Sequence, residues 1–311
     1  MEIDPRQNFI EFALHVIDHL GLPHPDVPTD GGGALEFGLN VDGLATVITY
    51  EPEIQPEHVL LECRVGPISG ELNAATNLLA SNARVLIHGG PTWGLDAETR
   101  EVTCSAMLAV RGTHASSLAD NIRSLARWAR MWSQRAGSEF AEFSRNWELV
   151  PLTEPAQDDR RATFGDALSR IRASHGVQPL NETALAAGGR RVWVSLDGAA
   201  LALTHGLATD EFFTACVVGD PLDGALAGGV TESLLEANRL SLQEAGLVFG
   251  LDAQRRRLLC RLTAMMPCRD IDGLLDGMRL AFDGISNCDT SDDAQGQMPS
   301  LQMSSLPFLR P

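Results

Sequence analysis

The sequence predicts an α+β protein built from two tandem copies of one domain, each an antiparallel sheet with flanking helices. The chain of 311 residues is long enough for two domains of ordinary size. Shifting the sequence by about 155 residues aligns its two halves. Within each half, helical and strand patterns follow the order α-β-β-β-α-β-β-α, without the β-α-β alternation of a Rossmann-like fold.

The internal repeat keeps a nearly constant offset along both halves, which chance matches between common residues would not do. Solenoid repeats have periods of roughly 20–50 residues, so an offset this long indicates duplication of a whole domain. The matched residues include Phe9 with Phe164, Asp42-Gly43 with Asp197-Gly198, Asn82 with Asn238, Gly94-Leu95-Asp96 with Gly250-Leu251-Asp252, and Cys104 with Cys260.

The repeat also predicts the domain boundaries. We expect copy 1 at residues 1–135, a linker with a helical part at 136–160, copy 2 at 161–285 and a disordered tail at 286–311. The tail is rich in Ser, Asp, Gln and Pro, a composition typical of disordered segments. Spaced apolar residues return at 298–311, and we therefore consider the hypothesis that the tail occupies a binding groove of its own chain or of a neighbour.

Each copy is predicted to begin with an amphipathic helix. Apolar residues recur at helical spacing from Phe9 to Leu20, and Gly21 ends the pattern. The second copy repeats this pattern from Phe164 to Gly176.

A hairpin and a third strand come next. Alternating apolar residues flank Asp42-Gly43 in the first copy and Asp197-Gly198 in the second. Asp-Gly between alternating runs is typical of a type I′ turn, which needs positive φ at both residues. We expect the third strand at Val59–Val65 and at Phe212–Val218.

A second helix, two strands and a last helix complete each copy. The second helix is expected at Glu71–Ala83 and at Ala227–Leu240, where Ala, Leu and Asn are frequent. The remaining strands are expected at Arg84–His88 with Trp93–Leu95, Glu101–Val110, Leu247–Leu251 and Arg256–Met266, and the last helices at Ser116–Ala129 and Ile271–Phe282.

The charge of the chain narrows the classes of partner. There are 41 acidic residues against 24 basic ones, which gives a formal net charge of −17. A strongly acidic surface repels phosphate backbones and anionic lipids, so nucleic acid and membrane are not expected partners. We find no apolar stretch long enough to span a bilayer and no pattern of a secretory signal.

No catalytic, cofactor or metal site is predicted, and we expect a protein that is not an enzyme. His15 and His19 have the spacing of a metal pair, but Arg170 and Ser174 stand at the matching positions of the second copy. The six cysteines form no Cys-x-x-Cys pair. Cys104 lies in a predicted strand without an evident base and is interpreted as a core residue.

The segment Gly94-Leu-Asp-Ala-Glu-Thr-Arg-Glu-Val-Thr and its copy from Gly250, together with the element order, resemble class I type III secretion chaperones of the CesT/Tir-chaperone type. The resemblance covers residues 6–133 and 161–284. Members of that family are usually single small domains that pair as homodimers. Two copies in one chain therefore imply an intramolecular pseudo-dimer, and they leave open whether the chain stays monomeric or dimerises further. The family pairs through the second helix and its neighbours, here Leu72, Leu78, Leu79, Leu234 and Leu235.

The resemblance implies a cytoplasmic bacterial protein, associated with virulence, that holds the extended N-terminal segment of a secreted effector and keeps it soluble and competent for export. An extended segment is accepted by a strand edge and by apolar surface beside it. The alternatives are a regulatory partner-switch protein that sequesters a regulator, a purely structural duplicated domain, and an enzyme of unrecognised type. The expected partner-binding residues are Phe9, Phe12, Val16, Leu35, Phe37, Val47, Phe164, Leu168, Val192 and Val194.

Overall fold

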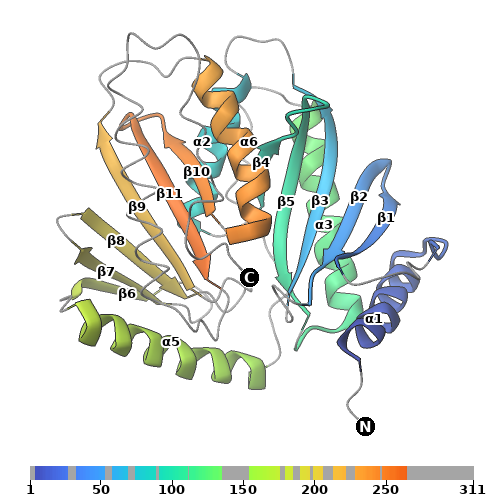
Figure 1. The fold of residues 1–311 in the computed structure, drawn as a ribbon, viewed down its shortest axis with the longest axis horizontal. Coiled ribbons are helices and arrows are strands. Elements are labelled where there is room, and N and C mark those ends of the chain that lie inside the picture. Colours follow the sequence, from blue (N-terminus) through green and yellow to red (C-terminus); the bar gives the residue numbers. More distant parts are fainter. Residues whose placement is uncertain are drawn as a thin grey trace.

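The computed structural model describes most of the chain as helices and strands arranged around two antiparallel sheets (Figure 1). The residues described are 4–26, 33–52, 58–68, 74–88, 91–110, 112–134, 154–175, 179–184, 190–196, 199–205, 213–221, 228–245 and 247–264. The fold is α+β, as the sequence predicts.

The element order is nearly the same in the two halves. The first half contains α1 (Pro5–Leu20), β1 (Leu35–Val41), β2 (Leu44–Tyr50), β3 (His58–Pro67), α2 (Ala74–His88), β4 (Thr92–Leu95), β5 (Glu101–Ala109) and α3 (Ala115–Gln134). The second half contains α5 (Glu154–His175), β6 (Pro179–Ala184), β7 (Arg190–Leu196), β8 (Ala199–His205), β9 (Phe213–Pro221), α6 (Gly228–Ala245), β10 (Leu247–Asp252) and β11 (Arg257–Ala264).

Both sheets are antiparallel in the described residues. The first has the strand order β1-β2-β3-β5-β4 and the second has the order β10-β11-β9-β8-β7-β6. Read in the opposite direction and without β6, the second order is β7-β8-β9-β11-β10, which matches the first strand for strand. The strands β1 and β2 correspond to β7 and β8, because adding 155 to the bounds of the first pair gives the bounds of the second pair.

Local chemistry explains where α1 begins and ends. Asp4 accepts a hydrogen bond from the backbone N–H of Arg6 at 2.9 Å, and Pro5 occupies the first turn, where no N–H is needed. Gly21 adopts φ 71°, and its N–H donates to the Asp18 carbonyl. This left-handed glycine cap ends the helix where the sequence predicts.

The predicted hairpin between β1 and β2 is confirmed. Asp42 and Gly43 both have positive φ, 52° and 82°, as a type I′ turn requires. The side chain of Asn40 accepts a hydrogen bond from the Gly43 N–H at 2.9 Å. Alternate residues of β1, from Leu35 to Val41, are buried.

The two halves also share irregular features. The β3–β5 pairing shifts register between Arg64 and Gly66, and the β9–β11 pairing shifts between Arg257 and Leu259, the corresponding place. Arg100 and Arg256 occupy the same turn position, with φ 60° and 53°. Such bulges and left-handed residues are specific features of a fold, so their recurrence supports an equivalent backbone in both halves.

Three sequence predictions need correction. Arg84–His88 is not a strand, because α2 continues to His88 and no Gly or Pro interrupts it before Gly89. The strand β6 was not predicted, because its polar sequence lacks apolar alternation, which an edge strand does not require. Helix α5 begins at Glu154, where we expected a linker, since Pro155 is compatible with a first helical turn.

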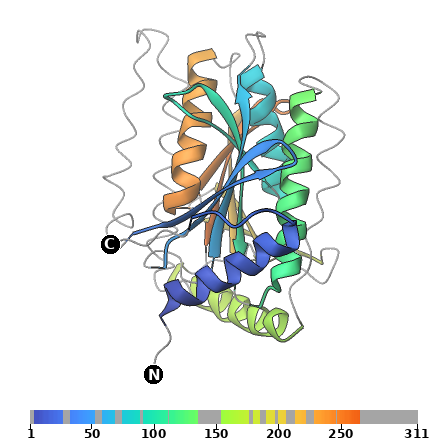
Figure 2. The same cartoon turned by 90° about the vertical axis from the view of Figure 1, so that its right-hand side faces the viewer.

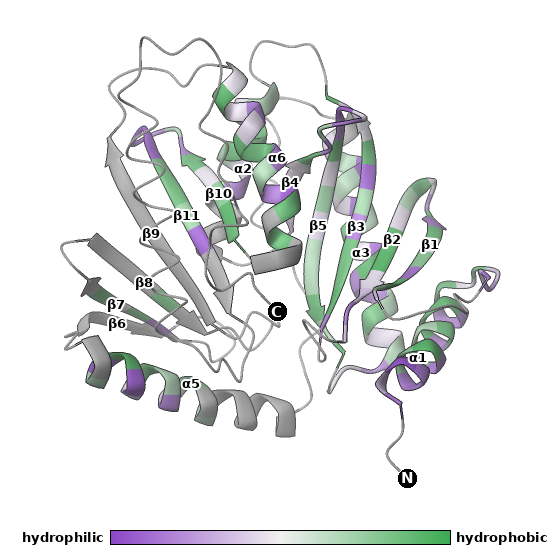
Figure 3. Cartoon of the chain, in the orientation of Figure 1, coloured by the Kyte–Doolittle hydropathy of each residue, from purple (hydrophilic) through white to green (hydrophobic). Residues whose placement is uncertain are grey.

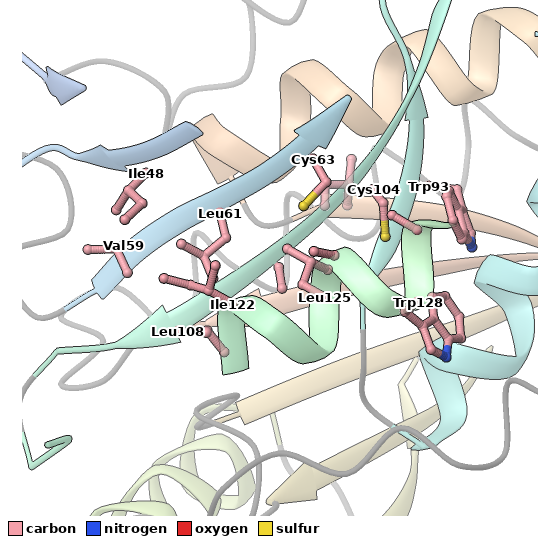
Figure 4. Packing of buried hydrophobic residues seen from close by; sticks show 14 of the residues in the cluster. Ile48, Val59, Leu61, Cys63, Trp93, Cys104, Leu108, Ile122, Leu125 and Trp128 are labelled. Atoms are coloured by element: carbon pink, nitrogen blue, oxygen red, sulfur yellow. The ribbon is translucent and has the colours of Figure 1, made fainter. Parts of the chain in front are cut away.

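Buried apolar residues form one continuous cluster that reaches both halves. In the first half, strand residues such as Leu61 and Leu108 face Ile122 and Leu125 of α3 (Figure 4). Helix α1 crosses α3 near one end of the first sheet (Figure 2). Hydrophilic residues gather at the outer turns and on the outer side of α1 (Figure 3).

In the described part of the chain, no helix is long and apolar enough to cross a membrane. The expected last helix at Ile271–Phe282 and the tail at 286–311 lie outside the described residues.

Candidate partner-binding surfaces

The second helices of the two halves lie side by side between the sheets (Figure 1). Helix α2 packs more extensively against β10 of the second half than against β4 of its own half. Helix α6 likewise packs against β4 of the first half. Each sheet therefore ends on a strand that is covered by the second helix of the other half.

A small apolar cluster fills the contact between the halves. It is separate from the main core and draws on strands and helices of both sheets. Its buried members are Leu60, Ala83, Leu242, Val248 and Leu259, and Trp193 packs against them.

Two buried asparagines connect each second helix to the neighbouring edge strand. Asn82 accepts from the Trp93 N–H at 2.8 Å and donates to the Trp93 carbonyl at 2.9 Å. Asn238 makes the same pair of bonds with Phe249, at 2.6 Å and 3.0 Å. Asn238 also donates to the Trp93 carbonyl at 3.4 Å, across the boundary between the halves. Such bonds satisfy backbone groups of β4 and β10, which are edge strands among the described residues.

Among the residues that the structure describes, the ion pairs between the halves lie on the side of α6. Arg239 lies 3.2 Å from a carboxylate oxygen of Glu62 and 3.2 Å from one of Asp96. Arg100 makes two hydrogen bonds of 2.9 Å with Glu232. At the positions that match Arg239 and Glu232, α2 has Ala83 and Thr76, which carry no charge. The contact of α6 with the first half therefore differs in chemistry from the contact of α2 with the second half.

Two carboxyl groups at this contact have a lowered pKa. Hydrogen bonds, first the one from the Thr99 N–H, lower the pKa of Asp96, and the charge of Arg239 acts in the same direction. The hydrogen bond from Arg100 lowers the pKa of Glu232. Both carboxylates are therefore ionised at neutral pH.

The residues expected to join the halves lie in α2 and α6. Leu78, Leu79, Leu234 and Leu235 are all buried, and the two helices contact each other. Leu72 lies outside the described residues. The sequence pattern gave no sign of Arg239 and Glu62, because an ion pair between distant segments leaves no periodic signal. The repeated Asn82 and Asn238 were a usable signal, since a polar residue on an apolar helix face needs a buried partner.

Most of the expected partner-binding residues of the first half are core residues. Phe9 stacks on Tyr50 with 4.1 Å between ring centroids and meets the edge of Phe37 at 6.1 Å. Val16, Leu35 and Phe37 are buried. Two of the expected residues, Phe12 and Val47, keep part of their surface exposed.

In the second half, the four expected partner-binding residues are buried. Phe164 and Leu168 of α5 belong to the main core, as do Val192 and Val194 of β7. Their contact with a partner stays a prediction, and as placed they offer a partner no accessible surface. Among the described residues, Leu240 of α6 is the one large apolar side chain that is clearly exposed, at 54%.

The outer edge of β1 has no strand partner among the described residues. The turn at Asp42-Gly43 pairs Val41 with Leu44, and hydrogen-bonded pairs then alternate with pairs that are not bonded. The N–H and C=O groups of Glu36, Gly38 and Asn40 therefore point away from β2. All three residues are exposed.

The cysteines of the first half are buried in the core. Cys63 and Cys104 lie opposite each other on β3 and β5. Burial raises the pKa of Cys63 to about 11 and raises the pKa of Cys104 as well. The described residues include no group of three or more His, Cys, Asp or Glu side chains placed to hold a metal ion.

Comparisons with known proteins give weak similarities. No protein-family model and no curated protein matches the sequence. A chain of the ExsC–ExsE complex matches 44% of this chain over 97% of its own length, with 19% identity and a TM-score of 0.36. A chain of the HopA1–SchA chaperone–effector complex matches 43% of this chain over 100% of its own length, with 18% identity and a TM-score of 0.33.

Proposed function

We propose that this protein is a chaperone that binds an extended segment of another protein, as class I type III secretion chaperones bind their effectors. The observation that carries the proposal is the outer edge of β1. This edge offers three exposed residues whose backbone groups point outward. One face of the same sheet is covered by α1 and α3. Adding a strand to such an edge is a general mode of peptide recognition.

The arrangement of the halves supports a binding role in a second way. We propose that the halves are duplicated domains packed as a pseudo-dimer. Helices α2 and α6 lie at the centre, each packed on the edge strand of the other half. Because both halves belong to one chain, their effective concentration is high, about the millimolar range for a flexible connection, and weak contacts suffice to hold them together. This leaves the outer ends of the sheets for partners.

Phe12 and Val47 are the expected contact residues best placed to act. Phe12 lies on α1 beside Phe9, with 6.4 Å between ring centroids. Val47 lies opposite Gly38 on the face of the sheet that carries Glu62. A strand added at β1 would have Phe12 on one side of the sheet and Val47 on the other.

The test compares Gly38→Pro with Gly38→Ala. Proline removes the outward N–H of Gly38 without removing a hydrogen bond to β2, which is why edge strands tolerate it. Alanine keeps that N–H, and its Cβ would meet no atom within 4 Å. The tagged protein is purified with its native partner, and the bound segment is mapped by proteolysis and amide exchange.

The proposal expects that Gly38→Pro loses the segment and that Gly38→Ala keeps it. Protection of the Glu36, Gly38 and Asn40 amides in the complex is the second expected result. A partner that binds as a folded domain, or one that Gly38→Pro still binds normally, would contradict the proposal. The identity of the segment then distinguishes an exported effector from a sequestered regulator.

A further inference from the structure

In the second half, the sheet edge that corresponds to the outer edge of β1 is occupied by the chain itself. Strand β7 corresponds to β1 with the same bounds at an offset of 155 residues. β7 pairs with β8 on one side and with β6 on the other, whereas β1 pairs with β2 alone among the described residues. β6 thus lies where a partner strand on β1 would lie.

The backbone register of β6 supports this correspondence. Leu196 pairs with Ala199 at the turn between β7 and β8, so alternation directs the backbone groups of Arg191, Trp193 and Ser195 away from β8. Thr183 lies opposite Arg191, and Asn181 lies opposite Trp193. The matching residues on β1 are Glu36 and Gly38, whose backbone groups also point outward.

The sequence of the corresponding segment in the first half disfavours a strand at this place. At the same offset, β6 corresponds to residues 24–29, which read His-Pro-Asp-Val-Pro-Thr. Pro28 stands where the second half has Thr183, whose N–H faces β7. Proline has no N–H to donate, so it is excluded from this position of a ladder.

The first residue of this segment has a side-chain contact with α1. His24 lies 2.8 Å from the carboxylate of Asp18, near the end of α1. Residues 22–26 have no helical or strand structure. Pro28 thus disfavours a covering strand on β1 at the position that corresponds to Thr183.

We infer that the two edges are unequal: β6 permanently fills the partner-strand position of the second half, so that the chain accepts one extended segment, antiparallel to β1. This inference rests on the proposed function and adds stoichiometry, direction and register to it. By analogy with β6, the partner residues opposite Gly38 and Glu36 must be other than proline. The residue between them, opposite Phe37, comes to the side of the sheet that α1 covers, where an apolar side chain is favoured.

The first experiment disrupts the pairing of β6 with β7 and so exposes the edge of β7. Thr183→Pro removes an N–H that faces β7, whereas Glu182→Pro removes an N–H that faces outward and serves as the matched control. The probe is a labelled synthetic peptide with the sequence of residues 176–187, used at millimolar concentration. Amide exchange at Trp193 is expected to accelerate by about tenfold or more in Thr183→Pro and to stay unchanged in Glu182→Pro.

Peptide binding gives the stoichiometry. We expect about one peptide per chain for the unmodified protein and for Glu182→Pro, and about two for Thr183→Pro. A stoichiometry of one in Thr183→Pro, with the Trp193 amide exchanging rapidly, overturns the inference. If the native partner binds but spares the β1 amides, the proposed binding site and this inference both fail, whereas a stoichiometry of one in Thr183→Pro overturns the inference alone.

A second variant needs no added peptide. Replacing residues 24–29 by Pro-Leu-Asn-Glu-Thr-Ala, the sequence of β6, should cover the first edge from within. Slower amide exchange at Glu36 and Gly38, by about tenfold or more, and loss of the native partner are the expected results. Unchanged exchange at both amides overturns the correspondence between the two edges. Pairing of β6 with β1 of a second chain would appear as concentration-dependent dimers and would also overturn it.

Discussion

Gly94 of β4 lies directly against Arg239 of α6, so closely that a Cβ atom on Gly94 would come 2.8 Å from the Arg239 Cβ and 3.1 Å from its Cα. The second of these is a backbone atom that cannot rotate away. Thr103 approaches the same point from β5, at 2.9 Å. The glycine of the Gly-Leu-Asp segment is thus needed for contact between the halves.

We predict that Gly94→Ala destabilises the protein by about 1–3 kcal/mol, because the added methyl group forces α6 away from β4. Urea unfolding measures the change. Gly38→Ala is the matched control, since its methyl group would lie in open space, and it should change stability by no more than about 1 kcal/mol. Equal stability of both variants would show that α6 can shift without cost.

Replacing the buried asparagines should reveal their unequal contacts. Asn82→Ala loses two hydrogen bonds to Trp93, and Asn238→Ala loses two to Phe249 and one to Trp93. Each buried group that loses its partner costs about 1–3 kcal/mol, so Asn238→Ala is expected to be the more destabilising. Thermal unfolding is the measurement. Asn77→Ala, on the exposed side of α2, should stay within about 0.5 kcal/mol of the original.

The ion pairs on the α6 side predict a loss of stability in acid. The pKa values of Asp96 and Glu232 are lowered on folding, so their contribution is fully present above the unfolded values near 3.8 and 4.5 and is lost as the pH falls through the lower folded values. Glu232→Gln should therefore destabilise the protein more at pH 7 than at about pH 3. Denaturant midpoints at both pH values test this, with Glu11→Gln as the control. An equal effect at both pH values would contradict it.

The thiols of Cys63 and Cys104 are expected to be inert in the folded protein. A pKa of about 11 for Cys63, against 9.0 for an ordinary thiol, leaves about 100-fold less thiolate at pH 8, and burial excludes the reagent. Alkylation followed by peptide mass spectrometry should find both thiols unmodified until the protein is unfolded in urea. Rapid modification of either thiol in the native protein would show that β3 and β5 open locally.

Phe12 and Phe37 should respond differently to the same change. Phe37→Asp places a carboxylate among buried aromatic rings and is expected to prevent the first half from folding. Phe12→Asp keeps the charge near solvent, so we expect a folded protein with weaker partner binding. Circular dichroism and partner titration separate the two effects. Unchanged partner affinity in a folded Phe12→Asp variant would remove Phe12 from the binding surface.

Local signals in the sequence determined the order of the elements and several of their ends. Positive φ at Asp42-Gly43 and the left-handed cap at Gly21 follow from residue types that favour those conformations wherever they occur. The alternation in β1 and the helical spacing in α1 coincide with side chains that are buried. Burial and partner contact leave the same apolar pattern, however, so the pattern alone could not assign Phe9 or Phe37 to a surface.

Only the tertiary structure decided which segments meet. The contact of Arg239 with Glu62 joins residues far apart in the chain, and no local pattern encodes such a pair. The strand β6 forms because an open edge of β7 is available to its backbone, although its side chains carry no strand pattern. Threonine at residue 183 has a backbone N–H that faces β7, and proline at residue 28 has no such group. The tertiary structure gives that N–H its meaning, because β7 is paired on both sides whereas β1 pairs with β2 alone among the described residues.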